Sequence, residues 1–468
     1  MRNKLIVLAI AVVAAGLRLY GALVFPFEQD ELYTIDEAGR LFHTRLLPGI
    51  QARPVFFILE HPLVTWFPHT PLVLRVLPLI FGILGVFLTW LLARRYLGER
   101  ASIVAAVLVA VSPWHLYASG FARYYAMLYD LAALVYWLLP RAYDSDRPRD
   151  YLWAAAALLL GAWTHPSFVF PVAAAALAVM TVDWEGQTGW RWPSSNAWRW
   201  LWIPFVGASV VVAALIKAFT KAPSTVANGG DRGVMATLRL IPAMVDWMTL
   251  TVFVLALVGA VVLLQSKIPG RRQLGLMSIF GTGGMLVALF VLSFVTAIYA
   301  DYGIAALPLI LVGAAGLFQW VEDAVMPQQQ RSVMWALALL TIAGVFPSAV
   351  SYLSDGTRFD YRPVFSQIDR EGGLVTVLTK PIVLQRFYAP QLHAVELPSR
   401  PSQLDSLLER DHDLWVVTSV KRYGISGDDS HAVAGWLSGH CRPRGSYQRP
   451  RLDYRVYRVD LWRCGAGT

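Results

Sequence analysis

Two adjacent carboxylates, Asp30 and Glu31, follow directly after the first long apolar stretch of the sequence. That stretch, residues 5–24, follows the basic residues Arg2 and Lys4 and is long enough to cross a bilayer. The order places both acids at a membrane surface, where a carboxylate can take a proton from a hydroxyl group or help to hold a divalent cation. We therefore predict that Asp30 and Glu31 are catalytic residues acting on a lipid-borne substrate.

The composition decides the broad class of protein. Of the 468 residues, 56% are hydrophobic and only 15% are charged, and the mean hydropathy is +0.49. The apolar residues come in blocks of roughly 20, the length of a membrane-spanning helix. The sequence thus predicts an all-α polytopic membrane domain. Its net charge of +9 is spread over many loops without a basic stripe, which argues against nucleic-acid binding.

Hydropathy divides the first 355 residues into about eleven transmembrane helices. The first apolar run is longer than the usual signal-peptide core of about 7–15 residues, and bulky residues follow it, so we expect a retained helix. The block 151–182 has a polar break only at Thr164–Ser167, which predicts a turn between two helices, with one continuous helix as the alternative. The other expected spans are 72–93, 101–119, 124–139, 201–219, 240–264, 274–298, 302–321 and 332–352.

Charged residues in the loops predict the orientation. With a cytoplasmic N-terminus, every expected inner loop contains Arg or Lys, as the positive-inside rule requires. The expected outer segment 25–71, with juxtamembrane helices, has three Arg against six acids. We therefore expect an integral protein of the cytoplasmic (inner) membrane, with Asp30, Glu31 and the C-terminal residues on the outer side.

Residues 356–468 differ in character from the rest of the chain. Short β-prone runs at 374–378 and 414–418 are separated by Pro and Gly, and a helical pattern lies at 402–410. Alternating strand and helix signals predict a small extracytoplasmic α/β domain. The two cysteines of the chain, Cys441 and Cys464, both lie here. An oxidising compartment favours a disulfide between them, with two unpaired thiols as the alternative.

Five short motifs follow one another in the first part of the chain. They are Asp30-Glu31-Leu32-Tyr33-Thr34, Arg53-Pro54-Val55-Phe56-Phe57, Leu74-Arg75-Val76-Leu77-Pro78, Ser112-Pro113-Trp114-His115 and Ala122-Arg123-Tyr124-Tyr125-Ala126. In this order the sequence resembles the GT-C glycosyltransferases, and among them the family 39 and ArnT-like enzymes that use polyprenyl-phosphate sugar donors. The likeness covers residues 1–180 well and continues more loosely through 299–308 and 360–362.

The resemblance implies an inverting transfer of a sugar from a polyprenyl-phosphate donor to a hydroxyl of a lipid, glycan or protein acceptor on the outer face. Asp30 would then be the base. Arg123 would bind the donor phosphate, because a guanidinium donates paired hydrogen bonds and keeps its charge. The remaining donor-phosphate or substrate-binding candidates are Tyr125, His165, Tyr299 and Asp301.

The sequence departs from the family pattern at two positions. Gly120-Phe121 stands where relatives often have Gln-Glu, and Asp301 stands where they often have Arg. One hypothesis is that Asp301 replaces the missing acid. The positive charge that relatives have at position 301 would then be supplied by one of four other basic residues, Lys217, Lys221, Arg232 and Arg239.

Each candidate also has a structural interpretation. Glu31 could cap a juxtamembrane helix, Arg123 could extend to lipid headgroups, and His165 could make a structural hydrogen bond. We expect Asp36 and Glu37 to form the solvated face of the helix after Asp30. No His or Cys cluster indicates zinc. Asp30 could take part in a Mg²⁺ or Mn²⁺ site, and metal dependence stays open.

Two other classes of function compete with the enzyme. Carboxylates that line a path would suit a transporter or flippase, but the candidate acids cluster in one expected outer loop. A non-catalytic scaffold for a cell-envelope assembly is the other alternative, supported by the outer domain and by the two departures from the family pattern.

Overall fold

The computed structural model describes residues 2–42, 53–181, 194–202, 206–207, 210, 233–294, 298–356, 358–371, 376–379, 382–398, 400–421, 424–425, 430–448 and 457–465. The chain folds into two units. The first contains the described parts of 1–22, 37–223 and 231–349, and the second contains 23–36 and the described parts of 350–468. The division falls near the predicted boundary at 355, but residues 23–36 group with the C-terminal part of the chain.

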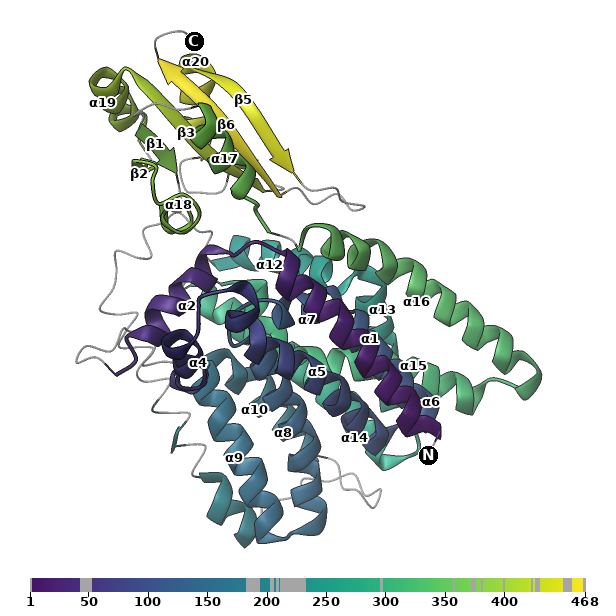
Figure 1. The fold of residues 1–468 in the computed structure, drawn as a ribbon. Coiled ribbons are helices and arrows are strands. Elements are labelled where there is room, and N and C mark those ends of the chain that lie inside the picture. The colour runs from purple at the N-terminus through teal and green to yellow at the C-terminus, as the bar shows by residue number, and fades with distance from the viewer. Residues whose placement is uncertain are drawn as a thin grey trace. The chain divides into compact units, whose positions relative to one another are not determined.

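The first unit is helical (Figure 1). Its helices, of which α1 and α16 end and α2 begins in the second unit, are α1 Arg2–Val24, α2 Gln29–Gly39, α4 Pro54–Trp66, α5 Pro71–Tyr96, α6 Glu99–Val111, α7 Pro113–Ser119, α8 Tyr125–Ser145, α9 Pro148–Thr164, η1 Pro166–Phe168, α10 Val169–Thr181, α12 Gly233–Met248, α13 Leu250–Leu264, α14 Pro269–Ser293, η2 Ala300–Ala306, α15 Leu307–Ala324 and α16 Pro327–Asp355.

Five of the described helical segments are long and apolar enough to cross a membrane, or seven if each of two bent pairs is one span. The protein is therefore an integral membrane protein. The predicted number of about eleven spans is not established by these segments, and most of the expected span 201–219 lies outside the described residues. The predicted turn in the block 151–182 is confirmed, because α9 ends at Thr164 and a 3₁₀ turn, η1, precedes α10.

Small residues allow α13 and α15 to pack closely. A Cβ atom added at Gly259 of α13 would lie 2.0 Å from the carbonyl oxygen of Gly313 on α15. Two backbones approach this closely only where no side chain separates them. Glycine at 259 is thus required by the packing of two apolar helices against each other.

Arg18 of α1 stabilises a break between α6 and α7. These helices meet at an angle of 58°, and Pro113 begins α7. Proline has no backbone N–H, so it removes a helical donor from the carbonyl of Val109. The buried Arg18 guanidinium replaces it, donating to Val109 at 3.1 Å and to Ala110 at 3.1 Å, and it lies 2.8 Å from Nδ1 of His115. One arginine thereby satisfies backbone groups that lipid cannot.

The second unit contains a six-stranded mixed sheet in the order β2-β1-β3-β6-β5, with β4 paired to β3. β1 pairs in parallel with β2 and β3, whereas β6 is antiparallel to β3 and β5. The elements are α17 Arg362–Glu371, β1 Thr376–Thr379, α18 Ile382–Tyr388, β2 Ala394–Glu396, α19 Pro401–Asp411, β3 Asp413–Lys421, β4 Gly424–Ile425, α20 Ser430–His440, β5 Cys441–Gln448 and β6 Tyr457–Gly465.

The central strand β3 is buried along residues 414–417, as its continuous apolar run indicates. Leu414 and Val416 belong to a buried cluster with residues of α19 and α20, such as Leu404 and Leu437. α17 packs against β5 and β6 through a separate apolar side. The small α/β domain predicted from the sequence therefore has a three-layer arrangement.

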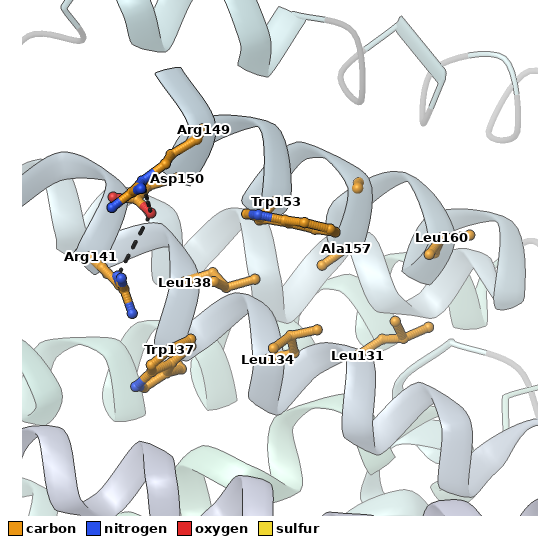
Figure 2. Close-up of a pocket in the computed structure, with 11 residues that line it drawn as sticks. Leu131, Leu134, Trp137, Leu138, Arg141, Arg149, Asp150, Trp153, Ala157 and Leu160 are labelled. Atoms are coloured by element: carbon orange, nitrogen blue, oxygen red, sulfur yellow. Dashed lines mark ion pairs between the residues drawn. The ribbon is translucent and has the colours of Figure 1, made fainter. Parts of the chain in front are cut away.

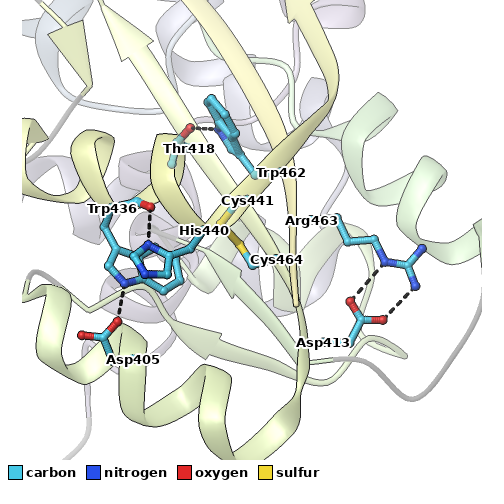
Figure 3. Close-up of a disulfide and its surroundings, with 9 residues drawn as sticks. All are labelled: Asp405, Asp413, Thr418, Trp436, His440, Cys441, Trp462, Arg463 and Cys464. Atoms are coloured by element: carbon cyan, nitrogen blue, oxygen red, sulfur yellow. Dashed lines mark hydrogen bonds and ion pairs between the residues drawn. A yellow bond between two sulfur atoms is a disulfide. The ribbon is translucent and has the colours of Figure 1, made fainter. Parts of the chain in front are cut away.

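The structure contains a disulfide between Cys441 and Cys464, which face each other at the start of β5 and the end of β6 (Figure 3). Its Cα atoms are 4.1 Å apart. Cys464 is fully buried in the cluster shared with α19 and α20. The bond therefore joins an edge strand to the core of the domain.

Candidate active site

Arg123 lies in the short connection between α7 and α8. The connection is buried, and the Arg123 backbone N–H donates to the carbonyl of Phe121 at 2.6 Å. The side chain is only 7% exposed, and its Nη1 donates to Oε2 of Glu37 at 2.5 Å. A tight turn thus fixes a buried guanidinium beside a carboxylate of α2.

Arg53 brings a second positive charge to the same carboxylate. It directly precedes Pro54, the first residue of α4, and its Nη2 lies 3.9 Å from Oε1 of Glu37. Its Nη1 donates to the hydroxyl of Tyr124 at 2.8 Å, and its Cζ lies 5.1 Å from that ring's centroid. Two arginines therefore share one glutamate, and the three side chains have a net charge of +1.

Aromatic side chains extend this group of residues. The Tyr124 ring stacks on His165, with centroids 4.8 Å apart and an interplanar angle of 16°. Tyr302 of η2 lies on the His165 ring at 5.0 Å. We call Glu37, Arg53, Arg123, Tyr124 and His165 the arginine cluster. Its members come from the ends of α2, α4, α8 and α9, where the chain turns between helices.

Burial and charge set the protonation of the cluster. Burial, together with the nearby charge of Arg53, lowers the pKa of His165 well below its ordinary value, so the ring is neutral. Burial opposes the charge of Arg53, but Tyr124 and Glu37 outweigh it and raise its pKa. Arg53 therefore keeps its charge at neutral pH. A cationic, partly dehydrated group of this kind is suited to a phosphate, which guanidinium groups bind through paired hydrogen bonds.

The neutral His165 makes stability depend on pH. In the unfolded chain a histidine binds a proton below about pH 6.5, whereas the folded His165 does not, so acid favours unfolding by up to about 1.4 kcal/mol per pH unit below that value. When the pH falls from 7.5 to 5.5, the free energy of unfolding should therefore decrease by about 1 kcal/mol less in His165→Asn than in the wild type. Unfolding in detergent at both pH values measures this. The exposed His412→Asn variant is the control and should follow the wild type. An equal loss in all three proteins would contradict the assignment.

Asp30 and Glu31, which both belong to the second unit, differ sharply in their exposure to solvent. Asp30, in the first turn of α2, is exposed. Glu31 is fully buried, accepts a hydrogen bond from the backbone N–H of Glu28 at 2.9 Å and lies 3.9 Å from Nη1 of the buried Arg358. The backbone contact is the reciprocal half of a helix-capping arrangement. These contacts favour the structural interpretation of Glu31 and leave Asp30 as the accessible acid.

The other predicted site residues lie beside the cluster. Tyr125, the first residue of α8, has its ring 4.7 Å from that of Tyr124. The exposed Tyr299 contacts the ring of Tyr302 at 5.6 Å, and Asp301 lies in the first turn of η2. Of the residues suggested to compensate for Asp301, Lys217, Lys221 and Arg232 lie outside the described residues, and Arg239 is exposed on α12.

Sequence reasoning missed roles for Glu37, Arg53 and Tyr302. We expected Glu37 on a solvated face, but its side chain is only 16% exposed, because Arg123 and Arg53 contact it. Arg53 was part of a recognised motif without an assigned role. Its position directly before a helix-starting proline was the available signal.

No group of three or more His, Cys, Asp or Glu side chains that could hold a metal ion occurs among the residues described.

Comparison with known proteins extends this picture. Residues 55–216, about a third of the chain, match the family model described as dolichyl-phosphate-mannose-protein mannosyltransferase. No curated protein matches the sequence.

Three solved structures illustrate the structural likeness. ArnT from Cupriavidus metallidurans has a TM-score of 0.52 and 14% identity, covering 98% of this chain and 97% of that protein. The oligosaccharyltransferase AglB from Archaeoglobus fulgidus, in complex with an inhibitory peptide and a dolichol-phosphate, has a TM-score of 0.54 and 13% identity over 98% of this chain and 74% of its own. The arabinofuranosyltransferase AftD from Mycobacteria has a TM-score of 0.51 and 16% identity, covering 98% of this chain and 41% of that protein. The resemblance inferred from the motifs is therefore confirmed, and the chain has the fold of the GT-C glycosyltransferases.

Proposed function

We propose that the protein is a membrane glycosyltransferase that moves a sugar from a polyprenyl-phosphate donor to a hydroxyl group of a lipid, glycan or protein acceptor on the outer face of the inner membrane. The observation that carries this proposal is the arginine cluster, a buried cationic group within a GT-C fold. Such a group suits an anionic leaving group. AglB, which shares the fold, holds a dolichol-phosphate in its structure, and this supports a lipid phosphate as the donor class.

In the proposed reaction, the acceptor oxygen forms a bond to the anomeric carbon while the bond from that carbon to the donor phosphate breaks. The acceptor proton passes to the carboxylate of Asp30, and the bond electrons leave with the polyprenyl phosphate. Asp30 suits the role of base because it is an exposed acid in the first turn of α2. The inverting stereochemistry follows from the resemblance to the family.

Arg123 and Arg53 would stabilise the phosphate as its negative charge grows. Glu37 contacts both guanidinium groups, and the three side chains together carry a net charge of +1 that would attract an anionic ligand. Tyr124 and His165 would orient Arg53 and exclude water from its side. The electrostatic attraction is strongest where the surroundings are dehydrated, as they are at these buried side chains.

The test is transfer by the purified full chain from a panel of polyprenyl-phosphate sugars carrying labelled sugars. We expect product from at least one donor. Arg123→Gln should raise the KM for that donor by about 10- to 100-fold, because a hydrogen bond to a charged group is worth about 1.5–3 kcal/mol. Arg123→Lys should recover part of the loss.

Arg94→Gln is the control for a lost positive charge, since Arg94 lies at the far end of α5 and is 45% exposed. It should leave the donor KM within about twofold of the wild type. Wild-type protein that transfers sugar from no donor would contradict the proposed function and favour a scaffold role. Transfer with an unchanged KM in Arg123→Gln would contradict the role of the arginine cluster alone.

A further inference from the structure

A groove runs between α8 and α9 (Figure 2). Its volume is about 630 Å³. Most of its wall is apolar and includes Leu131, Leu134 and Leu138 of α8 and Ala157 and Leu160 of α9. Along each helix the lining spans about ten residues, which corresponds to roughly 15 Å, half the thickness of a bilayer's hydrocarbon core. The groove therefore has the length of one membrane leaflet.

One end of the groove is charged. Asp150 lies 3.8 Å from Nε of Arg141 and 4.0 Å from Nε of Arg149, and the two arginine side chains are 44% and 67% exposed. Asp150 itself is largely buried and accepts a hydrogen bond from Ser145 at 2.6 Å. The three charged groups sum to +1. An anion with a single negative charge would therefore balance this end.

Two tryptophans mark the level of the charged end. The Cζ atom of Arg141 lies 5.2 Å from the centroid of the Trp137 ring, and Trp153 is exposed on α9. Tryptophan prefers the headgroup layer of a bilayer, and arginines near helix ends reach to the same layer. The groove thus combines an apolar wall about as long as one membrane leaflet with a cationic opening beside two tryptophans.

The charged end lies opposite the arginine cluster along the same helices. Arg141 is in the last turns of α8, whose first residue lies two positions after Arg123, and Arg149 is in the first turn of α9, whose last residue adjoins His165. The groove is therefore separate from the cluster that we propose binds the donor phosphate.

We propose that this groove binds an anionic membrane phospholipid, with one acyl chain along α8 and α9 and its phosphodiester between Arg141 and Arg149. The lipid would lie in the leaflet opposite to that of the arginine cluster. A phosphodiester has one negative charge and matches the charge of the groove's end, whereas a zwitterionic lipid places a cation near the arginines. Basic pockets between transmembrane helices bind lipid headgroups in this way.

Native mass spectrometry of the full chain in detergent tests this proposal. Phosphatidylglycerol and phosphatidylcholine with identical acyl chains are compared, and inorganic phosphate is the third probe. We expect one retained phosphatidylglycerol, bound at least about tenfold more tightly than phosphatidylcholine. The double variant Arg141→Gln/Arg149→Gln should abolish the difference. Arg147→Gln is the control, because Arg147 is an exposed neighbour that does not line the groove, and it should keep the preference.

A second pair of variants tests the apolar wall without changing charge. Ala156 lines the groove, so Ala156→Phe should fill it and lower phosphatidylglycerol retention at least about fivefold. Leu152→Phe adds bulk to an exposed position of α9 outside the groove and should leave retention unchanged. Equal binding of both lipids, or equal effects of the two phenylalanines, would overturn the proposal. Phosphate binding that matches lipid binding, or a second copy of the chain in place of the lipid, would do so too.

Discussion

Replacing Asp30 with asparagine should lower the kcat of sugar transfer by about 10²- to 10⁴-fold, the usual contribution of a positioned general base. The amide keeps the size of the carboxylate but cannot accept the acceptor's proton. The donor KM should change by less than about threefold, because in this proposal the base does not bind the lipid phosphate of the donor. Initial rates at varied donor concentration separate the two effects.

Asp36→Asn is the matched control for this variant. Asp36 is an exposed aspartate of the same helix, six residues after Asp30, and the helical repeat directs it to another side. We expect its kcat to remain within about twofold of the wild type. A full rate in Asp30→Asn would remove this residue as the base, and equal losses in both variants would indicate a general effect on α2.

Replacing Arg18 with methionine should destabilise the protein by about 3 kcal/mol or more, since it leaves two buried carbonyl groups without donors and each such group costs about 1–3 kcal/mol. Those carbonyls belong to Val109 and Ala110 at the break between α6 and α7. Methionine has a similar length and keeps apolar contacts, so the loss reports on hydrogen bonds. Unfolding of the purified protein in detergent measures it.

Arg100→Met is the control for Arg18. Arg100 is in the first turn of α6, its side chain is 75% exposed and it contacts Glu322 at 3.3 Å. Exposed ion pairs contribute little, so this variant should lie within about 0.5 kcal/mol of the wild type. If Arg18→Met instead has the same free energy of unfolding as the wild type, lipid or water must satisfy the carbonyl groups at the break. Failure of Arg18→Met to accumulate as folded protein, with normal Arg100→Met, agrees with the expected loss.

Local features of the sequence were sufficient for many elements. The polar break in an apolar block predicted the turn after Thr164, and the pattern at 402–410 predicted the helix now seen as α19, Pro401–Asp411. The run at 414–418 corresponds to β3, Asp413–Lys421. These signals succeed because a period or a helix-breaking residue acts within a few positions. The order of motifs was equally informative about the fold.

Side-chain partners far apart in the sequence were not predictable in the same way. Arg123 contacts Glu37 across 86 positions, and Arg53 contacts Tyr124 across 71. An acid on an otherwise polar helix is usually solvated, so periodicity alone gave the wrong environment for Glu37. Glu31 and Arg358 form a buried pair that links the start of α2 to the C-terminal part of the chain. Only the assembled packing decides which charges meet.

A residue just before α2 makes a contact with a residue that is synthesised much later. The backbone N–H of Phe27 donates to the hydroxyl of Tyr388, 361 positions further along the chain. At roughly 5–20 residues per second, a ribosome needs roughly 20 to 70 s to add that length. Until then the segment that leads into Asp30 lacks its final contacts. A prematurely terminated polypeptide that ends before Tyr388 would therefore lack this contact to the segment that leads into α2.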